Sequence, residues 1–213
     1  MNSLDQKLYS IGIQLAGDFE RRTHDFVDIE ETLIEACYQI NSDGRLLSLI
    51  MSWVKVHGNY IVTEKLIKIY KRVSKERGET PWFNALLSFA AHECSQKFSK
   101  WVKKEKKKVF WQSKEITENL IALKGALPYW EKINIFVSVS SLRIRDRDVL
   151  TPKELVKFNY QYRNRYLYGP SWRADIITMI DSGITTPSKI SKLLGCSYEP
   201  ANRIFREYST VMG

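Results

Sequence analysis

Three Thr-Pro dipeptides constrain the fold of this chain more than any other feature. They are Thr80-Pro81, Thr151-Pro152 and Thr186-Pro187. Threonine is favoured just before a helix begins, and proline is favoured at the first helical position, where its missing N–H is no loss. Apolar residues at helical spacing follow each dipeptide. We therefore expect a mainly α-helical protein whose helices begin at defined points.

The first 110 residues carry the same helical period. Apolar positions recur over 29–40, 46–57 and 63–73, and Asn41 to Gly44, Gly58 and Gly78 separate these segments. Thr63 is the expected N-cap of the third segment. The helix that begins at Pro81 is expected to run through Phe98 into a lysine-rich stretch.

Two short runs are typical of strands, namely Val109 to Trp111 and Ile133 to Val139. They predict a small β element. After a charged connector, Thr151-Pro152-Lys153-Glu154 matches a capping box, and one long helix is expected from there to Leu167. We therefore predict a helical interaction or dimerisation domain over residues 1–145 and a helix-turn-helix domain over 146–213.

The composition excludes several classes of protein. The longest apolar runs fall far short of the ~20 residues that a membrane helix needs, and the N-terminus carries no signal-peptide pattern. We therefore expect a cytoplasmic protein without a membrane segment. Cys37, Cys94 and Cys196 are odd in number and widely spaced, which argues against a disulfide framework or a zinc ribbon.

Charge is distributed unevenly along the chain. The net charge is +9, which suggests a polyanionic partner. Residues 1–50 hold four Lys or Arg against nine Asp or Glu, residues 97–114 hold eight against one, and residues 151–213 hold nine against five. The acidic N-terminal region and the basic remainder are thus expected to meet different partners, the former a protein.

Residues 171–208 predict a helix-turn-helix. They divide into three short amphipathic segments, the first ended by Gly183 and the second begun by Thr186-Pro187. Gly195 supplies a left-handed turn before the third segment, which Ser197 can cap. Two short helices joined by a turn of three or four residues define the motif. The alternative is an ordinary three-helix unit with a solvated polar face.

In such a motif the second helix of the pair reads base edges of double-stranded DNA in the major groove. Asn pairs with adenine and Arg with guanine, while side chains at the start of the preceding helix contact phosphate. The outward residues that we expect to contact DNA are Ser188, Lys189, Ser197, Tyr198, Asn202, Arg203 and Arg206.

Residues 147–208 also resemble bacterial winged-helix and helix-turn-helix transcriptional regulators, including those encoded beside abortive-infection nucleotidyltransferase toxins. The run Leu167-Tyr168-Gly169 followed by Arg173-Ala174-Asp175-Ile176 is similar to the opening helix of that family. The resemblance covers the last third of the chain and implies an antitoxin-like regulator. Only five residues follow Tyr208, so we expect the family's two-stranded wing to be absent or built from elsewhere.

The lysine-rich stretch offers a second basic surface. Lys97, Lys100, Lys104 and Lys108 would share one face of a continuing helix, near Trp101. Such a face can follow the phosphate backbone of DNA. It can equally be a solvated helix end whose lysines complement the helix dipole.

Signs of catalysis are weak. No GxSxG, P-loop, GxGxxG or HExxH motif occurs, and His24, His57 and His92 are isolated. The acidic cluster around Asp28, which includes Asp25, Glu30, Glu31 and Glu35, favours a helix start over a metal site. We therefore expect no enzyme, no catalytic residue, no cofactor and no metal.

Two classes of function remain. The first is a DNA-binding transcriptional regulator, and the second is a helical protein-interaction module without a DNA role. A helix-turn-helix without a wing covers little DNA, so we expect a homodimer. The predicted dimer contact is a stripe on the long helix from Thr151, formed by Leu155, Phe158, Tyr162 and Tyr166.

Overall fold

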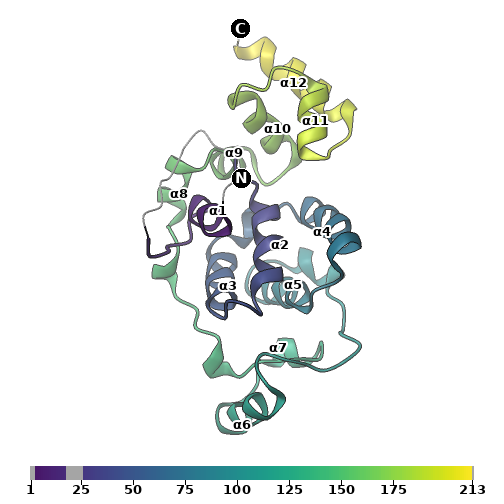
Figure 1. Cartoon of the computed structure of the whole chain (residues 1–213). Helices are drawn as coiled ribbons and strands as arrows, with labels where there is room; N and C mark the ends of the chain where they lie inside the picture. The colour runs from purple at the N-terminus through teal and green to yellow at the C-terminus, as the bar shows by residue number, and fades with distance from the viewer. Residues whose placement is uncertain (1–2, 18–25, 213) are drawn as a thin grey trace.

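The fold is mainly α-helical, as the sequence predicted. A computed structural model describes residues 3–17 and 26–212. Its first part is a body of five α-helices that occupies the middle of Figure 1. They are α1 (Leu4–Ser10), α2 (Ile29–Gln39), α3 (Arg45–His57), α4 (Thr63–Arg77) and α5 (Pro81–Glu93). The expected limits of α2 and α3 are close to these, whereas α4 begins at Thr63 itself, with Val62 as its N-cap.

Three fully buried tryptophans organise the core of the body. Trp53, Trp82 and Trp130 are each at most 1% exposed. Each indole N–H donates a hydrogen bond, to the Ile11 carbonyl (2.7 Å), the Asn41 side chain (2.7 Å) and the Ala85 carbonyl (2.8 Å) respectively. Large apolar surfaces are thus buried without leaving any of these three indole N–H groups unpaired.

A small β element lies at one end of the body. Strands β1 (Val109–Phe110) and β2 (Ile135–Phe136) pair in parallel, with Val109 opposite Ile135. Helices α6 (Lys114–Lys124) and α7 (Pro128–Glu131) lie between them in the chain and close the lower end of Figure 1. The second strand is shorter than predicted because Ile133 and Asn134 lie in a turn, with Asn134 at φ +63°, and Ser138 forms an isolated bridge with Ala126.

The helix expected to continue from Pro81 into the lysine stretch ends early, so that prediction is wrong. It ends at Glu93, and a separate 3-10 helix, η2, spans Gln96–Trp101. The Ser95 side chain accepts a hydrogen bond from the Lys97 N–H and begins this new turn, which buries Phe98 in the core. Lys97, Lys100, Lys104 and Lys108 therefore do not share one helical face.

The long helix expected from Thr151 to Leu167 is also broken in two. The predicted capping box is present at the start of α8 (Pro152–Phe158), but Asn159 is extended and α9 (Tyr160–Tyr168) begins after it. The Asn159 side chain accepts from the Tyr162 N–H (2.8 Å) and donates to the Ser10 carbonyl (3.1 Å). This pair of bonds makes the break and fixes it against α1.

The break changes the predicted dimer stripe. Leu155 and Tyr162 are fully buried in the core of the body, whereas Phe158 and Tyr166 are exposed. A stripe formed by all four residues is therefore not available to a second chain.

The C-terminal unit has its own small core. It consists of α10 (Trp172–Asp181), α11 (Pro187–Leu194) and α12 (Tyr198–Met212), at the top of Figure 1. Its buried residues are Ile176, Ile177, Met179, Ile190, Leu194, Ala201 and Ile204. Val149, Leu150, Leu155 and Tyr162 belong instead to the core of the body. The core of the body thus extends to Tyr162, and the core of the C-terminal unit begins after it. The predicted boundary at residue 145 lies earlier in the chain.

Candidate nucleic-acid interface

Helices α11 and α12 are joined by the three residues Gly195, Cys196 and Ser197. Gly195 has φ +66° and ψ 23°, the left-handed conformation that glycine adopts without steric cost. The Ser191 hydroxyl donates to the Cys196 carbonyl (2.8 Å), which ties the turn to α11. Ser197 occupies the position before the first residue of α12, where its role as a cap was predicted.

The residues predicted to contact DNA lie on the outside of this unit. Asn202 is half-buried, and the other six are exposed, namely Ser188, Lys189, Ser197, Tyr198, Arg203 and Arg206. Ser188 and Lys189 stand in the first turn of α11, as expected. Glu207 lies 4.0 Å from Arg203 and is bound at 2.6 Å by Arg173. The guanidinium group of Arg203 thus remains open to an incoming ligand.

A buried ion network fixes this unit to the body, and sequence reasoning missed it. Arg165 of α9 is fully buried and binds two carboxylates with paired hydrogen bonds. Its bonds to Glu30 of α2 measure 2.6 and 2.7 Å, and those to Asp175 of α10 measure 2.7 and 2.8 Å. Lys65 of α4 adds contacts of 2.5 Å to both Asp28 and Asp175. Such two-point contacts fix orientation as well as distance.

Glu30 and Asp175 keep their charges although both are fully buried, whereas burial raises the pKa of Asp28. Burial by itself raises the pKa of Asp175, but Arg165 and Lys65 outweigh this effect and lower the pKa to about 2. Burial likewise opposes ionisation of Glu30, and the same two cations lower its pKa. Asp175, part of the run that resembles the winged-helix family, therefore serves here to dock α10 on the body.

Helix α4 contacts the turn of the helix-turn-helix unit. The Lys68 ammonium donates to the Gly195 carbonyl at 2.5 Å, so α4 touches the turn itself. Figure 1 shows α4 beneath α11 on the same side of the molecule. Lys68, Lys71 and Lys75 are exposed and share one helical face. Their spacing of three and four was readable in the sequence, but nothing there placed α4 beside the turn.

The lysine stretch does not form one surface. Lys97 is half-buried and donates to the carbonyls of Ile61 (3.0 Å) and Asn59 (3.3 Å). Lys100 is exposed, and its ammonium lies 5.4 Å from the Trp101 ring. Lys104 is exposed in the irregular segment that follows, and Lys108 lies over the Phe136 ring near the β element. The first two lysines therefore lie near α4, whereas Lys108 belongs to the other end of the body.

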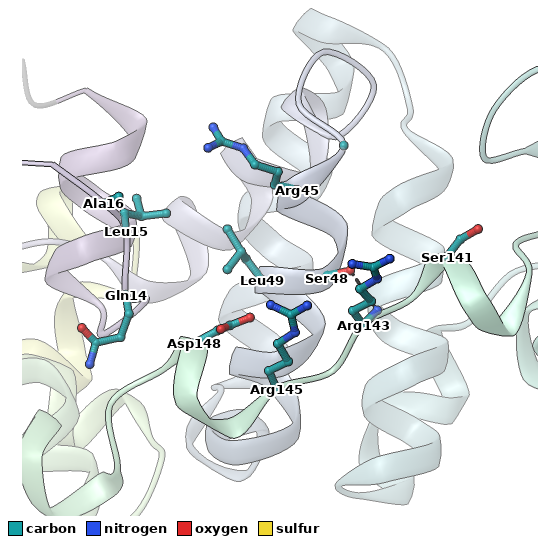
Figure 2. Close-up of a pocket in the computed structure, with 11 residues that line it drawn as sticks. Gln14, Leu15, Ala16, Arg45, Ser48, Leu49, Ser141, Arg143, Arg145 and Asp148 are labelled. Carbon is teal, nitrogen blue, oxygen red and sulfur yellow. Dashed lines mark hydrogen bonds between the residues drawn. The ribbon is translucent and has the colours of Figure 1, made fainter.

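The body carries a separate arginine-lined pocket of about 430 Å³. Figure 2 shows Arg45, Arg143 and Arg145 around this hollow, with Asp148 beside them. The hydroxyls of Ser48 and Ser52 accept hydrogen bonds from the backbone N–H groups of Arg143 (3.1 Å) and Arg145 (3.0 Å), which fixes that segment. The arginine side chains are exposed, so this pocket can attract anions without enclosing them.

Three of the residues considered for catalysis or metal binding have structural roles, namely His57, Asp28 and Glu30. His57 is buried, and its ring contacts the Leu150 carbonyl (2.9 Å) and the Tyr162 hydroxyl (2.8 Å). Asp28 and Glu30 serve the ion network, while Asp25 and His24 lie outside the described residues. Over 3–17 and 26–212 no group of three His, Cys, Asp or Glu side chains is placed to hold a metal ion. In the same ranges no helix is long and apolar enough to cross a membrane.

No protein-family model, curated protein or solved structure matches the chain. The resemblance to winged-helix regulators stays a prediction that rests on the residues quoted above.

Proposed function

We propose that this protein is a DNA-binding transcriptional regulator that reads double-stranded DNA with α12. The observation that carries the proposal is the left-handed Gly195 in a three-residue turn between two short helices. This turn leaves Asn202, Arg203 and Arg206 on the outer side of α12, next to the exposed Tyr198. Asn and Arg are the side chains that pair bidentately with adenine and guanine.

The neighbouring cations support the same proposal. Lys68 lies at the turn, and Lys71 and Lys75 follow on the exposed face of α4. Together with Lys189 at the start of α11, they can neutralise phosphates on either side of the groove that α12 would enter. The ion network fixes the helix-turn-helix unit to α4, so these lysines would be in position before DNA binds.

The rest of the proposal follows from the sequence. The protein acts in the cytoplasm as a homodimer without catalytic activity, in the manner of an antitoxin-like autoregulator. A protein partner binds the acidic N-terminal region. With the predicted dimer stripe partly buried, the exposed part of α9 at Tyr166 remains for the contact between two chains.

One observation favours a second candidate, a protein-interaction module without a DNA role. Tyr166, Leu167 and Tyr168 are exposed in succession at the end of α9, and Leu193 of α11 is 57% exposed. Apolar side chains gathered on a surface are typical of contacts with other proteins. This second candidate is the better supported of the two if α12 proves not to read DNA.

The test compares specific with nonspecific binding. A duplex is first selected from a random library with the purified protein, and its scrambled version serves as the reference. Arg203→Ala should lose about 1–3 kcal/mol of affinity for the selected duplex and much less for the scrambled one, because base edges carry sequence information and phosphates do not. Fluorescence anisotropy across a salt series measures both.

The control variant is Lys124→Ala, an exposed lysine on α6 at the far end of the molecule. It should bind both duplexes like the parent protein. Equal losses on both duplexes for Arg203→Ala would make this residue a phosphate contact. No selectable duplex, or no loss on either, would reject the reading role of α12.

A further inference from the structure

The arginine-lined pocket of about 430 Å³ has two walls of different chemistry. Leu15 and Ala16 belong to one wall, and the segment from Ser141 to Asp148 forms the other. The start of α3 lies between them, as Figure 2 shows, and contributes the half-buried Leu49. One side of the pocket is thus apolar and the other is basic.

The two walls are joined at one end of the pocket. The Gln14 N–H donates a hydrogen bond to the Asp148 carbonyl (2.8 Å), and Ile13 forms an isolated antiparallel bridge with Val149. These backbone contacts close the pocket beside Asp148 and fix the position of one wall against the other. The pocket is therefore a groove with a closed end.

The basic wall presents two arginines at a regular spacing. The backbone is extended at Leu142 (φ −100°, ψ 109°) and at Arg145 (φ −138°, ψ 118°). Leu142 and Ile144 pack against the core, and the residues that alternate with them, Arg143 and Arg145, are exposed in the groove. Alternate residues of an extended chain lie on one side, about 7 Å apart. The hydrogen bonds from both arginine N–H groups to α3 hold this spacing.

Both of these guanidinium groups are available to a ligand. Over residues 3–17 and 26–212 the side chains of Arg143 and Arg145 form no ion pair and donate no hydrogen bond. Figure 2 shows the two side chains next to each other at one edge of the hollow. Arg45, in contrast, is already paired with Asp43 (2.8 Å). Guanidinium groups bind carboxylates and phosphates through paired hydrogen bonds, so the groove should accept one of these anions.

From these features we infer that the groove binds an extended, acidic segment of a partner protein. Alternate side chains of an extended peptide also lie about 7 Å apart, so two of its carboxylates can meet Arg143 and Arg145 together. The side chains between them point the other way, toward the wall of Leu15 and Ala16. A segment in which acidic and apolar residues alternate therefore fits both walls.

The same groove suits the DNA backbone poorly. The half-buried Asp148 places in the wall a carboxylate that has no ion-pair partner among the described residues. A peptide can set an apolar side chain beside Asp148, whereas each nucleotide of a strand carries a phosphate that this carboxylate repels.

The groove also lies away from the proposed DNA-reading side. Helices α3 and α4 flank α2 on opposite sides in Figure 1, and α4 is the one that contacts the turn before α12. A partner bound in the groove would leave α12 open. The inference therefore does not rest on the proposed function.

The test uses a short fluorescent peptide in which glutamate and leucine alternate, titrated into the full-length protein. Fluorescence anisotropy should show saturable binding that weakens as the salt concentration rises. A peptide with lysine in place of glutamate should not bind. A peptide with serine in place of leucine should bind more weakly, because it leaves the apolar wall in contact with water.

Three variants locate the binding site. The double substitution Arg143→Gln and Arg145→Gln should weaken binding of the glutamate–leucine peptide by about tenfold or more, because each arginine donates hydrogen bonds to a charged group. The matched control is Arg147→Gln, since Arg147 is exposed on the same segment but does not line the groove. Its affinity should equal that of the parent protein. Asp148→Asn should bind more tightly, a gain that misfolding cannot produce.

The inference would be overturned by no binding of the glutamate–leucine peptide, by an equal loss in Arg147→Gln, or by equal binding of the lysine or serine peptide. A single-stranded oligothymidylate is titrated in parallel. If it binds as tightly and with the same dependence on Arg143 and Arg145, the groove is a nucleic-acid surface and the proposed occupant is wrong. None of these variants alters α12, so the result is independent of whether α12 reads DNA.

Discussion

The body and the helix-turn-helix unit are stabilised in different ways. The body buries three tryptophans and a continuous apolar core that reaches from Leu8 to Tyr162. The unit of α10 to α12 spans roughly 40 residues, a size at which an apolar core alone rarely suffices. Its core consists of aliphatic side chains and Met179, and Asp175 and Thr178 of α10 are buried as well. The unit therefore depends on its attachment to the body. Most of the buried charge lies at this attachment.

Buried charges hold this attachment, whereas apolar side chains fill the core of the body. Glu30, Lys65, Arg165 and Asp175 are all fully buried, and each has an oppositely charged partner. Buried ion pairs add little to stability relative to a well-packed apolar contact, but removal of one partner leaves a charge without compensation. Three tests break or sharpen the comparison between the two regions.

Arg165→Met should have the largest effect. The substitution leaves Glu30 and Asp175 buried with only Lys65 between them, so the free energy of unfolding should fall by about 3–5 kcal/mol. Urea denaturation measures the loss. Hydrogen exchange should show that amides of α10 to α12 lose more protection than those of α3 and α5.

The matched control is Arg173→Met, which removes an exposed ion pair with Glu207 on the same helix-turn-helix unit. An exposed pair contributes about 0–1 kcal/mol, so stability should barely change. Equal effects of the two substitutions, or an equal loss of protection in the body and in the helix-turn-helix unit, would contradict the view that buried charges hold α10 on the body.

The body should respond to mild acid through His57. Burial lowers the pKa of this histidine to about 4, although its hydrogen bond to the Leu150 carbonyl opposes the shift. Between pH 6.5 and 4 the unfolded chain binds a proton at His57 and the folded protein does not. Stability should therefore fall by about 1.4 kcal/mol per pH unit as the pH drops through this range. Urea denaturation at several pH values measures the slope.

The contribution of Asp175 to stability should be lost only at lower pH. The pKa of Asp175 is lowered to about 2 in the folded protein. The stability that Asp175 contributes is therefore fully present above the ordinary pKa near 3.8 and is lost as the pH falls below that value.

The variant that tests the role of His57 is His57→Gln, which should lower stability at pH 7 and flatten the slope between pH 6.5 and 4. An unchanged slope in this variant would assign the acid sensitivity to another group.

Gly195→Ala should have the smallest effect and should act on the unit alone. A Cβ atom at this position meets no other atom within 4 Å, so the cost is that of a left-handed backbone, about 1–2 kcal/mol. Thermal unfolding measures it. Gly195→Asn should cost less because asparagine tolerates this conformation. An alanine variant as stable as the parent protein would show that the turn does not need its left-handed residue.

The sequence by itself determined the features that depend on neighbouring residues. The Thr-Pro starts of α5, α8 and α11 and the left-handed Gly195 were predictable because capping and turn geometry act over a few residues. The same applies to the outward residues of α12, since helical spacing alone separates them from Ile204 and Ala201. The positions of both short strands were also predicted, although not the length of the second.

Tertiary structure decided what depends on residues far apart in the chain. Glu30 and Arg165 are separated by 135 positions, and no local pattern distinguishes this pair from ordinary surface charges. The break at Asn159 arises because its side chain bonds to Ser10, and the end of α5 arises because a new turn at Ser95 lets Phe98 enter the core. The arginine-lined groove likewise exists only because packing brings Leu15, Leu49 and Arg145 together from three segments. Such contacts are selected by the fit of the whole core, which local propensity does not encode.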